Sequence, residues 1–88
     1  MTQFVIERAM PGAGSLSEAQ LNGIALKSTA VMKDLDIQWV HSYVTTDKIY
    51  CIYRAPSQEA ILEHARQLGL PVDRISPVSH LVGSEGVR

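Results

Sequence analysis

Apolar residues in the first third of the chain change from a strand-like run to helical spacing. Residues 4–6 (Phe-Val-Ile) open a run of about seven residues that predicts a β-strand, and Met-Pro-Gly at 10–12 ends it. The positions that follow recur at steps of three and four, which predicts an amphipathic helix ending near Asp34 or Leu35. The positions on this helical stripe are Leu21, Ile24, Ala25, Ser28, Val31, Met32 and Leu35.

Two serines compete for the start of this helix. Ser15 and Glu18 have the S-x-x-E spacing of a capping box, in which each side chain accepts a hydrogen bond from the other residue's free backbone N–H. Ser17 is the rival N-cap, because it also precedes the first helical turn. We expect the helix to begin at one of the two.

The period of the pattern changes to two in the middle of the chain. Residues 38–44 and 48–54 are rich in Val, Ile, Tyr and Trp, and Thr-Thr-Asp at 45–47 separates them. β-Branched and aromatic residues flanking a short polar segment predict a β-hairpin, although the Asn-Gly turn signature is missing.

A second helix and a last strand complete the pattern. Ser57 is the predicted N-cap of the helix, Gly69 its C-terminal cap, and Pro71 prevents its continuation. The apolar stripe of this helix consists of Ile61, His64, Ala65 and Leu68. Residues 72–82 predict a strand, and Pro77 within it indicates a sheet edge or a bulge.

The element order is therefore β-α-β-β-α-β. Short connections and right-handed crossovers convert this order into the ferredoxin-like plait, an α+β fold with a four-stranded antiparallel sheet and two helices on one face. We expect a single domain over residues 1–82, followed by a flexible C-terminal tail over residues 83–88.

The second face of this sheet is too apolar to remain in water. Val40 and Val44 lie at the alternate positions to Trp39 and Tyr43, so both faces of the hairpin carry apolar side chains. Large exposed apolar patches are rare in monomers. We therefore expect a two-fold homodimer, sheet against sheet, that closes into a dimeric α+β barrel with a central cavity.

The register of the hairpin decides which residues share a face. A loop with an even number of residues pairs Ser42 with Cys51 and His41 with Ile52, whereas an odd loop brings His41 beside Cys51. We favour the even register, because it places the smaller residues beneath the helices. The helix side then carries Val40, Ser42, Val44, Ile49, Cys51 and Tyr53. The dimer side carries Trp39, His41, Tyr43, Tyr50, Ile52 and Arg54.

Composition narrows the classes of function. The formal charge of −1 and the absence of a Lys/Arg run argue against nucleic acid and anionic membranes as partners. No segment approaches the about 20 apolar residues of a membrane span. A single cysteine forms no intramolecular disulfide, and we expect a cytoplasmic protein. The segment GAGS lacks the P-loop lysine and the dinucleotide spacing, so no organic cofactor is expected.

Three residues are candidates for catalysis near the helix–sheet gap. His64 lies on the apolar stripe of the second helix and is either a neutral core histidine or a base close to Cys51, Tyr53 and Glu7. Cys51 is either a small buried hydrophobe or a nucleophile that His64 activates. Glu7 and Arg8 are consecutive in a strand, so one of the two must be buried and needs a partner. No recognisable catalytic motif joins these residues, which favours a role other than catalysis.

The dimer side carries the candidates for ligand and metal binding. Trp39, His41, Tyr43 and Arg54 form either a small-molecule pocket or a dry interface. His80 belongs to the last strand, near the rim. The chain has no CxxC, HxxxH or acidic loop, so a metal site must use scattered side chains. The candidate ligands are His41, His64 and His80.

Three stretches together resemble a bacterial family known as domain of unknown function 4242. They are VIERAMPG, WVHSYVTTDKIYCIYRAPS and EAILEHARQLGLPVDRISPV, and they cover nearly the whole chain. The resemblance implies a dimeric ferredoxin-like subunit, because a characterised relative is described as a nickel-binding protein of this kind. It also implies Ni²⁺ binding at the dimer surface and a role in metal sequestration or homeostasis.

Three functions remain open at this point. The first is a small dimeric metal-binding protein, with nickel as the ion. The second is a cofactor-free enzyme or small-ligand binder that uses the dimer cavity or the helix–sheet cavity, with Glu7 or His64 as general base. The third is a plait that dimerises as an accessory module.

Overall fold

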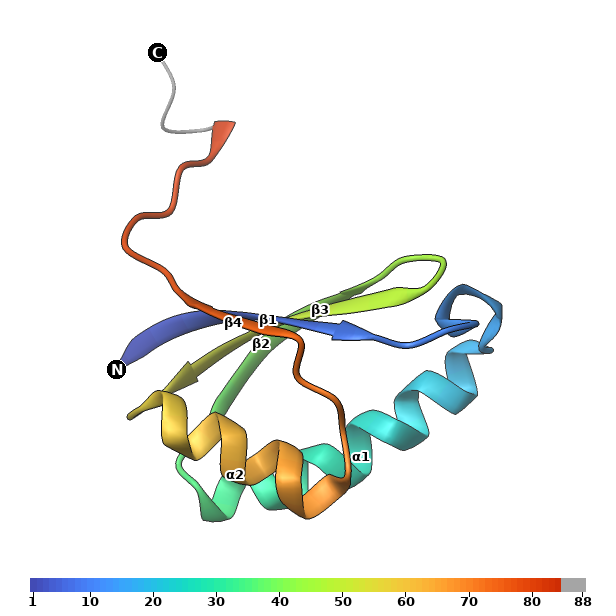
Figure 1. Ribbon diagram of the computed structural model, residues 1–88, viewed down its shortest axis with the longest axis horizontal. Helices are drawn as coiled ribbons and strands as arrows, with labels where there is room; N and C mark the ends of the chain where they lie inside the picture. Colours follow the sequence, from blue (N-terminus) through green and yellow to red (C-terminus); the bar gives the residue numbers. More distant parts are fainter. Residues whose placement is uncertain (85–88) are drawn as a thin grey trace.

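The computed structural model describes residues 1–84 of the 88-residue chain and follows the predicted order of elements (Figure 1). A short 3₁₀ helix, η1, is the one addition to that order within the described residues. The elements are β1 (Thr2–Ala9), η1 (Ala13–Ser15), α1 (Glu18–Asp34), β2 (Gln38–Val44), β3 (Lys48–Ala55), α2 (Gln58–Leu68) and β4 (Arg74–Pro77). Of the predicted tail, residues 85–88 lie outside the described residues.

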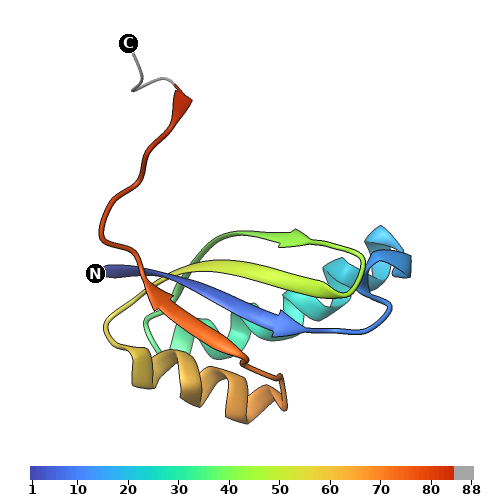
Figure 2. The same cartoon turned by 45° about the horizontal axis from the view of Figure 1, so that its top comes forward.

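The four strands form one antiparallel sheet in the order β2-β3-β1-β4. Both helices lie on the same face of this sheet, below it in Figure 1 and below or behind its strands in Figure 2, and the opposite face has no covering layer within residues 1–84. The predicted α+β, ferredoxin-like fold is confirmed. Neither helix of the described residues is long and apolar enough to cross a membrane.

The hairpin between β2 and β3 adopts the even register. Ser42 pairs with Cys51 and His41 with Ile52, as predicted. The register then shifts between Trp39 and His41, so that Trp39 pairs with Tyr53. A β-bulge of this kind leaves one extra residue, Val40, and moves the residues before it to the other face.

The bulge corrects one predicted face. Trp39 was expected on the dimer side with His41, but it lies on the helix side, beside Tyr53 and together with residues of α1. The indole N–H donates a hydrogen bond to Ser42 Oγ at 2.9 Å. Simple alternation fails here because it assumes an uninterrupted ladder.

The last strand is shorter than expected. The pattern predicted a strand over residues 72–82, whereas β4 contains only Arg74–Pro77. Pro77 lies at the end of an edge strand, where its missing N–H costs no ladder bond. Val78 N–H donates one more bond to Gln3 O at 2.8 Å, and residues 79–84 are exposed.

The helix caps agree with the sequence, and the choice between the two serines at the start of α1 is resolved. Ser17, not Ser15, is the N-cap: its Oγ accepts from Gln20 N–H at 3.1 Å, and Gln20 Oε1 accepts from Ser17 N–H at 2.8 Å. Ser15 belongs to η1 instead. Ser57 caps α2, and Gly69 ends it in the left-handed region with φ of 64°.

The loop after β1 touches the tip of the hairpin. Gly14 N–H donates to Thr46 O at 3.0 Å, and Met10 N–H donates to Asp47 O at 2.8 Å. A Cβ at position 14 would lie 2.9 Å from Thr46 Cα, so only glycine permits this approach.

The core lies between the sheet and the two helices. Its fully buried members include Ile6 of β1 and Ile61 of α2. Three polar side chains are buried in the same layer: Arg8, Ser28 and His64. The layer between the sheet and the helices therefore contains polar side chains as well as apolar ones.

Candidate functional site

Alternation along β1 decides which charged residue enters the core. Phe4, Ile6 and Arg8 point beneath the helices, and Glu7 points to the open face. Arg8 is 2% exposed. Glu7 Oε1 lies 3.6 Å from Lys48 Nζ on the open face. The predicted proximity of Glu7 and His64 is therefore wrong, because the sheet separates them.

Arg8 is held in the core with only part of its hydrogen-bonding capacity satisfied. Its Nη1 donates to the carbonyl of Pro71 at 2.7 Å, whereas its buried Nη2 has no partner within residues 1–84. The ion pairs within residues 1–84 are Lys48–Glu7 and Arg66–Glu63. No carboxylate oxygen of those residues therefore lies within 4.0 Å of the Arg8 guanidinium. A buried cation without a counter-charge is unusual.

His64 lies beside this guanidinium as a neutral imidazole. The residue is 0% exposed, its Nε2 lies 2.8 Å from Ser28 Oγ, and its buried Nδ1 has no partner within residues 1–84. Burial and the nearby charge of Arg8 both lower the pKa of His64. The ring meets Tyr53 edge-on, with centroids 5.7 Å apart. Of the predicted neighbours of His64, Tyr53 is present and Glu7 is not.

Tyr53 supplies a neutral phenol to the same layer. Burial, followed by the neighbouring Cys51, raises the pKa of Tyr53 to about 12, and Arg8 opposes this rise. Cys51 is itself buried. At neutral pH the phenol therefore keeps its proton and remains a hydrogen-bond donor.

A cavity of about 200 Å³ lies between α1 and the sheet. Arg8, Tyr53 and Cys51 line it from the sheet, and Ser28 and Met32 line it from α1. A helix–sheet cavity was one of the alternatives that the sequence left open, but Arg8 as part of its wall was not predicted; the Glu7-Arg8 pair signalled only that one charge had to be buried.

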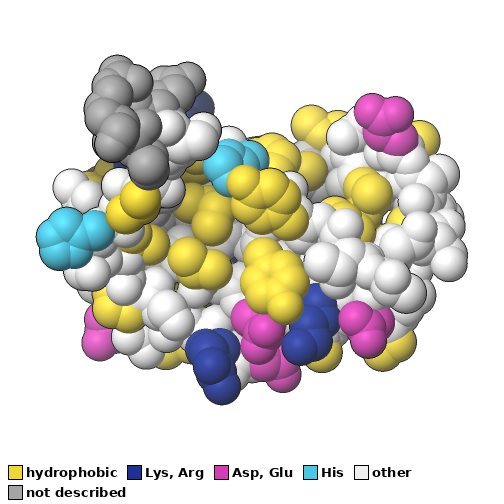
Figure 3. All heavy atoms as spheres, turned by 90° about the horizontal axis from the view of Figure 1, so that it is seen from above, with side chains coloured by type: hydrophobic (Ala, Val, Ile, Leu, Met, Phe, Trp, Pro, Cys, Tyr) yellow, Lys and Arg dark blue, Asp and Glu magenta, His cyan; other side chains and the backbone are white. Residues whose placement is uncertain are grey.

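The open face carries His41 among aromatic and aliphatic side chains. His41 packs edge-on against Tyr43, with ring centroids 4.9 Å apart, and Tyr43 is 59% exposed. Figure 3 views this face and shows hydrophobic side chains gathered next to a histidine. Arg54 is exposed on the same side of β3. The predicted pocket thus keeps His41, Tyr43 and Arg54 on one face but loses Trp39.

The three candidate metal ligands are not brought together in one copy. His64 lies beneath the helices, His41 on the open face, and His80 on the exposed segment after β4. Within residues 1–84 no three side chains of His, Cys, Asp or Glu lie close enough to hold a metal ion.

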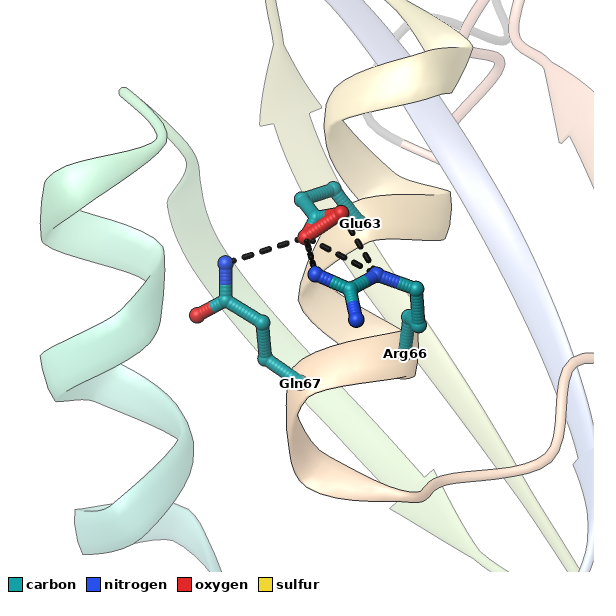
Figure 4. A network of polar contacts seen from close by, with 3 residues as sticks. All are labelled: Glu63, Arg66 and Gln67. Atoms are coloured by element: carbon teal, nitrogen blue, oxygen red, sulfur yellow. Dashed lines mark hydrogen bonds and ion pairs between the residues drawn. The ribbon is translucent and has the colours of Figure 1, made fainter.

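A separate polar network on α2 is an ordinary surface ion pair. Arg66 Nε donates to Glu63 Oε1 at 2.7 Å, and Gln67 Nε2 donates to Glu63 Oε2 at 3.1 Å (Figure 4). Hydrogen bonds from Arg66, and then from Gln67, lower the pKa of Glu63 to about 2. The network is exposed and stays ionised, so it contributes no acid–base group at neutral pH.

Comparison with known proteins adds a family and a fold neighbour. Residues 4–78 match the family model "Nickel responsive protein SCO4226-like". The fold is similar to the crystal structure of SCO4226 from Streptomyces coelicolor A3(2), with a TM-score of 0.79 and 25% identity, over 91% of this chain and 99% of that one. No curated protein sequence matches the chain.

Proposed function

The chain belongs to the SCO4226-like family of nickel-responsive proteins, and on that premise we propose that it binds Ni²⁺ as a homodimer. The proposed ligands lie on the open face of the sheet, with His41 at the centre. The observation that carries this proposal is an exposed imidazole on an apolar sheet face that no other element of residues 1–84 covers.

The composition of this face supports a second copy as its cover. Val5, Tyr50 and Ile52 occupy neighbouring strands on this side, and each is only partly buried in one copy. Tyr43 and His41 extend the surface across β2. A contiguous apolar face of this kind is typical of an interface, and a two-fold axis through it presents each residue twice.

A metal site shared between two copies would also have more ligands than the sheet face of one copy provides. Nickel takes square-planar or tetragonal nitrogen and oxygen sites, and imidazole is a suitable donor. One copy offers His41 alone on the sheet face, whereas two copies face to face offer two imidazoles. Glu7, on the same face, adds a carboxylate from each copy.

The other two histidines fit the proposal unequally. His80 is exposed on the segment after β4, so it is the second candidate ligand. His64 is the least suited, because it is fully buried and one ring nitrogen already contacts Ser28.

Calorimetric titration with nickel chloride tests the proposal. We expect stoichiometric binding by the native protein, and a loss of affinity of at least about tenfold in His41→Ala, because even residues that only hydrogen-bond a metal's ligands contribute that much. Gln38→Ala, on the same strand, is the matched control and should bind as the native protein does. A flat native titration, or unchanged affinity in the double variant His41→Ala/His80→Ala, would contradict the assignment.

A further inference from the structure

We propose that the cavity beneath α1 is a binding site for a small organic monoanion, namely a monocarboxylate with an apolar body, and that Arg8 provides its counter-charge. This site lies on the helix side of the sheet, opposite to the face proposed for nickel, so it is a second and independent function.

The first support is the unpaired guanidinium. Arg8 is almost completely buried, donates to the Pro71 carbonyl through Nη1, and keeps Nη2 without a hydrogen-bond partner in residues 1–84. Burying a charge without an opposite charge carries a large desolvation penalty. A carboxylate is the complement of this group, because the planar fork of arginine matches its two oxygens.

The second support is the charge of the cavity wall. The residues that line it include no Asp, Glu or Lys, so Arg8 is the only ionised side chain among them at neutral pH. Tyr53 remains a protonated phenol and can donate a hydrogen bond to an anion. One positive charge in an otherwise neutral wall selects a ligand with one negative charge.

The third support is the size and polarity of the space. The cavity measures about 200 Å³, and an apolar cavity of about 150 Å³ holds benzene. Much of the wall is apolar and includes Met10, Leu21, Met32 and Ile49. The ligand is therefore an aromatic or short-chain acid rather than an inorganic anion.

The cavity also has an entrance. Trp39 and Val44 of the edge strand β2, and Ile24 of α1, line the cavity and are about two-fifths exposed. A ligand can enter between α1 and β2 without opening the core around Ile6 and Ile61.

The test uses the chain's only tryptophan, because Trp39 lines the cavity. The native protein is titrated with benzoate, benzyl alcohol and benzylamine at constant ionic strength, and Trp39 fluorescence is recorded. We expect a saturable change with benzoate, and affinities at least about tenfold lower for the alcohol and the amine, since a charge-assisted hydrogen bond is lost. Acetate, which lacks the apolar body, should also bind more weakly.

Variants separate this site from the nickel site. Arg8→Met should weaken benzoate binding about tenfold to a hundredfold while nickel binding persists. His41→Ala should weaken nickel binding while benzoate binding persists. Arg8→Lys, which keeps the charge but not the fork, should retain part of the affinity.

Two results would overturn the proposal: equal affinities for benzoate and benzyl alcohol, or no saturable change with any of the probes. Either would indicate that Arg8 serves only to fix the Pro71 carbonyl. If Arg8→Met does not fold, the comparison of benzoate with benzyl alcohol on the native protein still tests whether the cavity prefers an anion.

Discussion

Arg8 and His64 place a cation and a neutral imidazole in the layer between helices and sheet. The charge of Arg8 and the burial of His64 act in the same direction, because both disfavour a proton on the imidazole. Protonation of His64 would put a second positive charge into a layer that holds no carboxylate within reach of the first. The two side chains therefore link the stability of the core to pH.

We expect the free energy of unfolding to fall as the solution is acidified. The pKa of His64 in the folded state lies below its unfolded value of 6.5, so in the range below 6.5 the unfolded chain binds a proton that the folded chain does not. The free energy of unfolding then rises with pH in this range, by at most about 1.4 kcal/mol per pH unit. The contribution of His64 is fully present above the unfolded pKa of 6.5. Urea unfolding between about pH 7 and about pH 5 measures the slope.

His64→Gln should remove this contribution to the slope, because glutamine does not titrate. His41→Gln is the matched control and should keep it, since His41 is exposed on the open face. An unchanged slope in His64→Gln would assign the pH dependence to other groups.

At the residue scale the sequence indicated part of the site. It placed His64 beneath the helices near Tyr53, which the structure confirms. It also required that Glu7 or Arg8 be buried. It did not decide which, because residues 4–6 are all apolar and leave the phase of β1 undetermined.

At the element scale, the start of α1 depends on one serine. Ser17 and Gln20 satisfy each other's backbone N–H groups, so Ser17→Ala should lower the free energy of unfolding by about 1 kcal/mol. Ser15→Ala is the matched control and should have little effect, because Ser15 lies in η1 and does not cap α1. Thermal unfolding of both variants measures the difference. Equal losses would contradict the assignment of the cap.

Most element boundaries followed from local signals, and the misses have local causes. Ser57 and Gly69 mark the ends of α2 in the sequence as in the structure. No glycine or proline marks the bulge at Val40 in the sequence. The change in the face on which Trp39 lies was therefore not predictable. The last strand ends at Pro77, opposite Phe4, because only Thr2 and Gln3 remain before the start of β1 is reached.

At the scale of the whole molecule, the sheet has one face beneath helices and one open face. The fold class was predictable, because the order of elements and the handedness of crossovers leave few alternatives. A helix–sheet cavity was among the alternatives, but its volume and lining were not predictable, because they depend on how α1 lies over the edge strand β2. Association of two copies stays a prediction.

A charge on the open face should prevent the proposed dimer. Tyr43→Glu places a carboxylate on that face next to His41, and burying it against a second copy is costly. Leu62→Glu on α2 is the matched control, since Leu62 is exposed on the helix side of the molecule. Sedimentation should find twice the 9.7 kDa chain mass for the native protein and the control, and one chain mass for Tyr43→Glu. A native protein that sediments as a single chain would remove the shared nickel site as well.

The bulge at Val40 has a further consequence, for the rim of the sheet. β2 is an edge strand, and a straight edge offers a row of free backbone donors and acceptors to any other chain. The extra residue interrupts that row, which discourages strand-by-strand polymerisation along this edge. The same irregularity that turns one indole inward thus protects the molecule against aggregation.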